Sequence, residues 1–193
     1  LMGLKNLELD TGEQLEATEE NLRATTRKIE SLVTQTLNTL RECDLNEESY
    51  SFEAQEVLNL AANKFNSEES GPRVSVIESS YSLQTIDNLK ANLILPILHN
   101  LIQNSIDSGP DVKVFLQVEL ENEFLSICVR DNGPGIPEEL KDNQFKPVQS
   151  QKENGSGIGL AICKELAERG NATIKLDRST DKGTSFSITF SVV

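Results

Sequence analysis

The sequence predicts an α+β protein in which a long helix or a helical hairpin precedes a domain of mixed strands and helices. Residues 14–41 contain no glycine or proline. Within them, apolar residues recur at seven-residue spacing, at Leu15, Leu22 and Ile29. Such a stripe is typical of a helix that packs in a bundle or coiled coil. Beyond it, alternating runs that indicate strands take turns with helical runs. We therefore expect a helical part over residues 1–45 and an α+β domain over residues 46–193.

Each element of the second part is predicted from its periodicity. Helices are expected at 52–65, 93–107 and 157–169. Strands are expected at 73–79, 112–120, 123–131, 172–178 and 184–192. Glu121-Asn122 and Asp181-Lys182-Gly183 are hairpin signals between two pairs of these strands, and Pro96 is tolerated in the first turn of its helix. Residues 134–155 lack periodicity and are rich in Gly, Pro, Gln and Lys, so they are expected to form a mobile loop.

The composition is that of a globular protein with a strong acidic excess. The 193 residues include 31 acidic and 18 basic ones, a formal net charge of −13. This excess argues against a nucleic-acid partner, because phosphate neutralisation needs clustered Lys and Arg. The cysteines Cys43, Cys128 and Cys163 show no CxxC spacing, which favours free thiols in a reducing compartment. No apolar run approaches the ~20 residues that span a bilayer. We expect a cytoplasmic chain, or the cytoplasmic part of a membrane-anchored protein whose anchor lies outside these residues.

Two glycine-containing runs near the C-terminus carry most of the functional information. The first follows a predicted strand and reads Asp131-Asn132-Gly133-Pro134-Gly135-Ile136. The second precedes a predicted helix and reads Gly155-Ser156-Gly157-Ile158-Gly159-Leu160. A carboxylate at a strand end can accept from the amino edge of a base. A glycine loop at a helix N-terminus offers N–H groups and a positive dipole end to phosphates. Together the two runs predict a nucleotide site with a flexible segment across it.

A third polar group lies on the predicted helix over residues 93–107. Asn100 and Asn104 are four residues apart and point to one side, opposite the side that includes Leu101 and Ser105. An amide oxygen is a neutral hard ligand that suits Mg²⁺, an ion that keeps several waters and bridges phosphates. A solvated helix face is the alternative interpretation of this pattern. The order of the asparagine pair and the two glycine runs along the chain favours the site.

These residues, taken in order, resemble a known family. The matching segments are residues 100–105, 131–136, 155–160 and Gly183-Thr184-Ser185-Phe186. Their order is similar to that in the catalytic domain of bacterial sensor histidine kinases, members of the Bergerat-fold ATPases with gyrase, the heat-shock 90 chaperones and the mismatch-repair ATPases. The resemblance covers roughly residues 50–193 and implies a two-layer α/β sandwich with a mixed sheet and helices on one face. Residues 1–41 resemble the helical hairpin through which such kinases dimerise, with Leu1–Leu9 as the tail of its first helix.

The resemblance also implies a role for each matching residue. Asp131 would accept from the adenine amino group, Gly135 would let the backbone approach the ring, and Thr184 would bind an ordered water beside the base. Asn104 would ligate Mg²⁺, with Asn100 next to the phosphates. The remaining cofactor-binding residues would be Gly133 and Ile136 in the first run, Gly155, Gly157, Ile158, Gly159 and Leu160 in the second, Phe145 as the anchor of an ATP lid, and Lys146 or Lys152 as a phosphate-facing cation.

The activity that the resemblance implies is transfer of the γ-phosphoryl group of ATP, with Mg²⁺, to a histidine on the first hairpin helix of a two-component kinase. The only histidine here, His99, lies in the predicted nucleotide helix. We therefore expect the acceptor a few residues before Leu1 and no autophosphorylation of this chain alone. Relatives that hydrolyse ATP have a Glu four residues before the Mg²⁺-binding Asn, so Asn100 predicts slow hydrolysis. The expected partners are a response regulator receiver domain and a second copy of the chain.

Two alternatives stay open at this level. One is a Bergerat-fold serine kinase of the anti-sigma type, against which the long N-terminal helix argues. The other is a non-enzymatic, nucleotide-sensing module that regulates a partner. Nucleotide binding without phosphotransfer would distinguish this module from a kinase.

Overall fold

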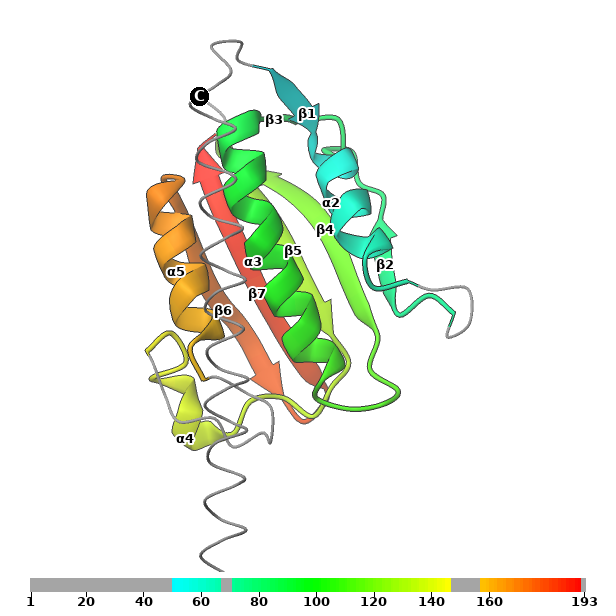
Figure 1. The fold of residues 1–193 in the computed structure, drawn as a ribbon, viewed down its shortest axis with the longest axis vertical. Coiled ribbons are helices and arrows are strands. Elements are labelled where there is room, and N and C mark those ends of the chain that lie inside the picture. Colours follow the sequence, from blue (N-terminus) through cyan, green and yellow to red (C-terminus); the bar gives the residue numbers. More distant parts are fainter. Residues whose placement is uncertain (1–49, 67–70, 147–156, 192–193) are drawn as a thin grey trace, which may run out of the picture.

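The computed structural model describes residues 50–66, 71–146 and 157–191. Its main feature is a five-stranded mixed sheet with helices packed against one face (Figure 1). The predicted helical part over residues 1–45 lies outside the described residues, as do the site candidates Lys152 and Gly155.

The strands of the sheet follow the order β2-β4-β5-β7-β6. They are β2 (Val74–Ile77), β4 (Val114–Glu121), β5 (Phe124–Asp131), β6 (Ala172–Thr180) and β7 (Gly183–Ser191). β2 pairs with β4 in parallel, and the other neighbours are antiparallel. Alternate side chains of β4, namely Val114, Leu116 and Val118, are fully buried. The period of two in a strand turns all three to the face that the helices cover.

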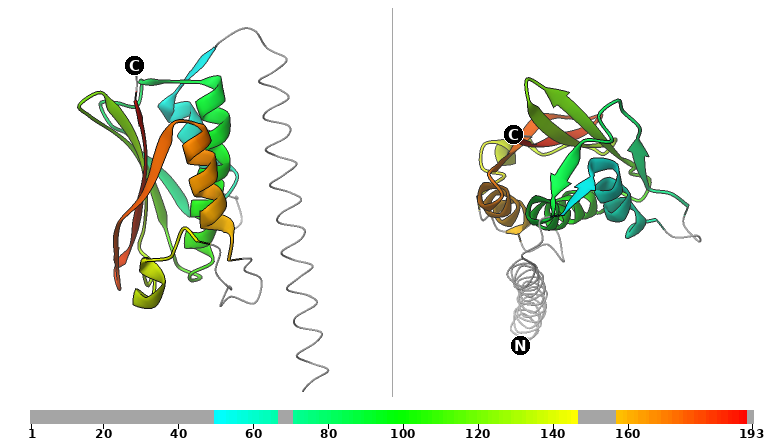
Figure 2. Two further views of the ribbon diagram at one scale, coloured as in Figure 1. Left: turned by 90° about the vertical axis from the view of Figure 1, so that its left-hand side faces the viewer. Right: turned by 90° about the horizontal axis from the view of Figure 1, so that it is seen from above.

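Three helices lie on one face of this sheet: α2 (Ala54–Asn63), α3 (Asn88–Ile106) and α5 (Gly159–Arg169). Figure 2 shows the two layers, with the strands on one side and the helices on the other. The core between them is apolar, and Leu98 of α3, Ile127 of β5 and Ile188 of β7 are completely buried. This arrangement confirms the predicted two-layer α/β sandwich. No helix within the described ranges has the length and apolar content needed to cross a bilayer.

A small two-stranded sheet beside α2 is absent from the sequence prediction. It consists of β1 (Ser51–Glu53) paired antiparallel with β3 (Thr85–Asp87). The predicted helix over residues 52–65 is therefore wrong at its start, because Phe52 pairs with Ile86 and the helix begins at Ala54. Three-residue strands are too short to show a periodicity. Pairing with a segment more than thirty residues away decides their structure.

Helix α3 begins five residues earlier than predicted, and Pro96 lies in its interior rather than in its first turn. The Asp87 side chain caps the helix by accepting from the Lys90 N–H at 2.8 Å, which satisfies a donor that the first turn otherwise leaves unpaired. A proline inside a helix removes a hydrogen bond and usually kinks or ends the helix. Here Ile94 and Ile97, on either side of it, are buried in the core. Their packing outweighs the local cost of the proline.

Both predicted hairpins are present, with small shifts in their turns. β4 and β5 connect through Asn122 and Glu123, one residue later than predicted, and both have positive φ angles, 48° and 68°. β6 and β7 connect through residues 181–182, and the register of β6 shifts between Leu176 and Arg178. Part of the predicted loop over residues 134–155 is a short helix, α4 (Glu138–Lys141).

The loop that follows α3 is held by the guanidinium of Arg73. This group donates to the carbonyl oxygens of Gly109 at 2.9 Å, Val112 at 3.3 Å and Ile106 at 3.4 Å. Further along the loop, the Lys113 N–H donates to Asn132 Oδ1 at 2.7 Å. Arg73 therefore fixes the loop between α3 and β4, and this loop is hydrogen-bonded in turn to Asn132, just after β5.

Candidate functional site

Asp131, the last residue of β5, lies where three separate segments of the chain meet. Its Oδ2 accepts a hydrogen bond from the Ser105 hydroxyl of α3 at 2.8 Å. Its Oδ1 accepts from two backbone N–H groups, that of Gly133 at 2.8 Å and that of Thr184 in β7 at 3.0 Å. Each carboxylate oxygen has about two acceptor positions. The two backbone donors therefore fill Oδ1, and Oδ2 retains acceptor capacity beyond the Ser105 bond.

The glycine-containing turn after Asp131 lies against the end of β6. Gly135 has a φ of +82°, and a Cβ at this position would lie 2.2 Å from the Thr180 carbonyl oxygen. Only glycine fits such a close approach. The next residue, Ile136, donates its N–H to Ser179 Oγ at 2.7 Å. The backbone of the turn is thus held in place by β6.

Asn100 and Asn104 lie side by side on α3, as their spacing predicts. Asn104 Nδ2 donates to Asn100 Oδ1 at 3.2 Å, and Asn100 Nδ2 donates to Cys163 Sγ of α5 at 3.3 Å. The Asn100 side chain is buried. A Cβ at Gly159, the first residue of α5, would lie 2.7 Å from both Nδ2 and Oδ1 of Asn100. The start of α5 therefore closes over the Asn100 amide. Asn104, half-buried, is the chain neighbour of Ser105.

The remaining described candidates lie near α4 and at the start of α5. Phe145 packs edge-on against Phe186 of β7, with 6.2 Å between the ring centroids. Lys146 is exposed, and its Nζ donates to Asn143 Oδ1 at 2.9 Å. The entry to α5 contains Gly157, Ile158 and Leu160. The structure therefore gathers two groups, one around Asp131 and one around the asparagine pair, with Lys146 outside both.

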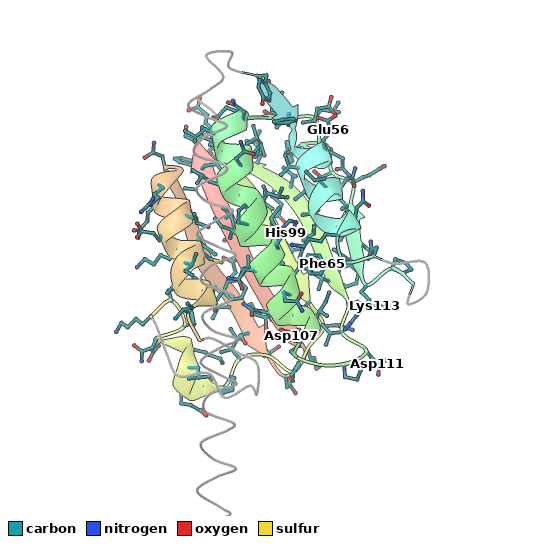
Figure 3. All side chains as sticks on the ribbon, viewed as in Figure 1. Glu56, Phe65, His99, Asp107, Asp111 and Lys113 are labelled. Carbon is teal, nitrogen blue, oxygen red and sulfur yellow. The ribbon has the colours of Figure 1, made fainter. Side chains whose placement is uncertain are left out.

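His99 faces α2, whereas its neighbour Asn100 faces α5. Its ring is edge-on to Phe65, with 5.8 Å between the centroids, and its Nδ1 lies 3.4 Å from Lys64 Nζ. Figure 3 shows His99 and Phe65 next to each other between the two helices. Burial, and the charge of Lys64, lower the pKa of His99 to about 4. His99 is therefore a neutral imidazole that packs between α3 and the end of α2.

Sequence reasoning missed two residues of this arrangement, Ser105 and Cys163. The helical projection places Ser105 on the apolar side of α3. A buried hydroxyl nearly always has a hydrogen-bond partner, and this is the signal that could have found it. Cys163 follows Gly159 by four residues and shares its face of α5. Nothing in the sequence shows which helix that face contacts.

Comparison with known proteins identifies the domain. The family of histidine kinase-, DNA gyrase B- and HSP90-like ATPases matches residues 90–193, more than half of the chain. The Probable C4-dicarboxylate sensor kinase of Bacillus subtilis is 32% identical over 128 residues, which are 63% of this chain and 24% of that protein. Sporulation kinase A of the same organism is 33% identical over 116 residues, 59% of this chain and 19% of that protein. The chain thus spans about a quarter or less of the length of these relatives.

A solved structure shows the same likeness in three dimensions. The catalytic domain of histidine kinase ThkA is 26% identical and superposes with a TM-score of 0.62, covering 75% of this chain and 95% of that one. Sequence family, named relatives and fold therefore agree. The chain belongs to the family of histidine kinase-, DNA gyrase B- and HSP90-like ATPases, and within it resembles the catalytic domains of histidine kinases.

Proposed function

We propose that this core binds ATP together with Mg²⁺ and transfers the γ-phosphoryl group to a histidine outside these 193 residues. One observation carries the proposal. The second half of α3 brings a fixed carboxylate and an asparagine pair together, because Ser105 contacts Asp131 and its neighbour Asn104 contacts Asn100. The carboxylate suits a base with an amino group. The amides suit a cation bound to phosphates.

In this proposal Asp131 selects adenine. Gly133 and Thr184 fill its Oδ1, so Oδ2 is the atom that would accept from the exocyclic amino group. Guanine has a carbonyl oxygen at the same position, which the carboxylate would repel. Gly135 would let the ring approach the backbone, and the Thr184 hydroxyl would hold a water beside the base.

The amide side chains of Asn104 and Asn100 suit a Mg²⁺ site. This ion takes oxygen ligands, keeps several waters and commonly combines one or two protein groups with substrate phosphates. Among residues 50–66, 71–146 and 157–191, no group of three or more His, Cys, Asp and Glu side chains could hold a metal by itself. The oxygen of Asn104 would be the protein ligand. When bound, the ion would supply charge neutralisation at the phosphate oxygens.

The residues of the chain would act by positioning rather than by acid–base chemistry. Asn100 has an amide where a base for hydrolytic water would need a carboxylate. A neutral imidazole needs no strong base, so transfer to histidine would proceed while hydrolysis stays slow. The N–H groups at the start of α5, with Gly157 and Gly159, would face the phosphates. Phe145 would anchor a lid segment that includes Lys146 and Lys152.

The partners follow from the same proposal. His99 packs against α2, so the acceptor would be a histidine upstream of Leu1, and two chains would associate through residues 1–45. The phosphoryl group would pass on to a response regulator receiver domain in the cytoplasm. The named sensor kinases among the relatives support this route. The net charge of −13 makes a nucleic-acid partner unfavourable.

The test separates ATP binding from phosphate acceptance. The chain is mixed with a longer form that extends upstream of Leu1 and carries Asn104→Ala, so that only the shorter chain can supply a working site. With labelled ATP and Mg²⁺, we expect acid-labile label on the longer form only. Label on the isolated 193 residues would contradict the proposed acceptor. ATP binding without transfer to the longer form would favour the nucleotide-sensing module.

A further inference from the structure

Two residues of α5 hold the Asn100 amide from the side opposite Asn104. Gly159 lies flat against it, because a Cβ there would come within 2.7 Å of both amide atoms. Cys163, one turn further along α5, accepts from Asn100 Nδ2 at 3.3 Å. Cys163 is only 1% exposed, and Asn100 is 8% exposed. This contact is therefore made in the interior, where a lost partner is not replaced by water.

The orientation of a buried amide is decided by its partners, because its oxygen and nitrogen ends have nearly the same shape. Asn100 directs Nδ2 at the Cys163 sulfur, so its Oδ1 turns toward Asn104. Asn104 must then direct Nδ2 at Asn100, and its own Oδ1 points elsewhere. If Asn100 turned over, Asn104 would have to turn over as well. In the structure the three side chains form a relay, in which Asn104 donates to Asn100 and Asn100 donates to the Cys163 sulfur.

We propose that Cys163 is a positioning residue of the nucleotide site, whose sulfur fixes the orientation of the Asn100 amide and, through it, that of the Asn104 amide. This role presupposes the proposed function, in which the oxygen of Asn104 is offered to Mg²⁺. A reversed relay would offer the Asn104 nitrogen instead, and an NH₂ group cannot ligate a cation. The thiol thus acts through two amides and does not touch the ligand.

The experiment compares three variants of the full chain. Cys163→Val keeps a side chain of similar size and removes the acceptor, whereas Cys163→Ser keeps a polar acceptor. Cys128→Val is the matched control, because Cys128 is also buried but lies on β5 with its pKa raised to about 11 by burial and nearby Glu119. It makes the same chemical change away from α5.

The first measurement needs no nucleotide. Side-chain amide resonances of Asn100 and Asn104 are assigned by NMR in each variant. We expect Cys163→Val to shift or double the signals of both residues, and Cys163→Ser to restore single signals. Cys128→Val should leave both unchanged. Unchanged Asn104 signals in Cys163→Val would overturn the relay, and backbone spectra show whether each variant is folded.

The second measurement is ATP affinity by calorimetry, with and without Mg²⁺. We expect Cys163→Val to weaken binding roughly three- to tenfold with Mg²⁺, the effect of one buried hydrogen bond. Without Mg²⁺ the change in affinity should stay below about twofold, because in this proposal only the cation binds the Asn104 oxygen and depends on how that amide is oriented. Equal losses under both conditions would show a merely structural role. If the wild-type chain bound no ATP, the proposed function would fail, and the amide resonances would still decide the relay.

Discussion

Replacing Asp131 by asparagine tests the assignment of the base-recognition site most directly. The asparagine oxygen can keep the two backbone donors, Gly133 and Thr184, which then place Nδ2 where Oδ2 accepts from Ser105 in the wild type. The Ser105 hydroxyl can rotate and accept from this amide. The second N–H of the amide would then face the amino group of adenine, and neither of these two N–H donors would have an acceptor.

The magnitude follows from these contacts. An unsatisfied buried group costs about 1–3 kcal/mol, so ATP affinity should fall roughly five- to 150-fold. The effect on the free energy of unfolding should be smaller. Hydrogen bonds to a charged acceptor are about 1 kcal/mol stronger than neutral ones, and the lower desolvation cost of the amide offsets part of the loss. We expect the free energy of unfolding to fall by about 1–2 kcal/mol.

The assay is calorimetry with ATP and with inosine triphosphate, whose carbonyl at position 6 accepts a hydrogen bond. Asp131→Asn should lower the affinity for ATP and raise the affinity for inosine triphosphate relative to that for ATP. Asp177→Asn is the control for the loss of one acidic charge, because Asp177 is exposed and accepts from Ser187 Oγ away from the site. Equal ATP affinity in wild type and Asp131→Asn would refute the reasoning.

Three further predictions concern stability. Gly135→Ala should lower the free energy of unfolding in urea by at least about 2 kcal/mol, whereas Gly71→Ala, which also has positive φ but no atom within 4 Å of the added Cβ, should lose about 1 kcal/mol. The pKa of His99 falls from 6.5 to about 4 on folding. The part of the folding stability that comes from this neutral imidazole is therefore complete above pH 6.5 and is lost as the pH falls toward 4. His99→Gln should remove about 1–3 kcal/mol of that pH dependence, and the single imidazole signal in NMR must titrate near pH 4. Arg73→Met should lower the free energy of unfolding by about 1–3 kcal/mol, because its hydrogen bonds to carbonyl oxygens are lost. Arg130→Met, which removes an exposed ion pair, should lower it by less than about 1 kcal/mol. Equal decreases in the two variants would contradict the role of Arg73.

The sequence is sufficient for the features that repeat locally. Alternation predicts β4, β5, β6 and β7, and the spacing of Asn100 and Asn104 predicts that their side chains meet. Asp131 is recognisable because a carboxylate before a glycine turn follows an apolar strand. These signals lie within one element and its adjacent turn, so no knowledge of the tertiary structure is needed.

The features that the sequence does not reveal depend on contacts between distant segments. β1 and β3 exist because they pair with each other, and neither is long enough to show alternation. The start of α3 could not be predicted, because a proline such as Pro96 normally lies in the first turn of a helix. The burial of α3 against the sheet, which the sequence does not show, is what allows Pro96 in its interior. Cys163 contacts Asn100 from another helix, 63 residues away in sequence. Only the assembled layers bring such residues into contact with the candidate site.

The hydrogen bonds to Asp131 connect the end of α3, the turn after β5 and the start of β7. The carboxylate proposed to bind the base therefore also holds these three segments of the fold together. A nucleotide held there would stabilise the native state by about 2.7 kcal/mol at a concentration one hundred times its Kd. Domains of this kind have a total stability of only about 5–15 kcal/mol. Resistance to proteases, and with it the amount of intact protein in a cell, would then follow the supply of ATP.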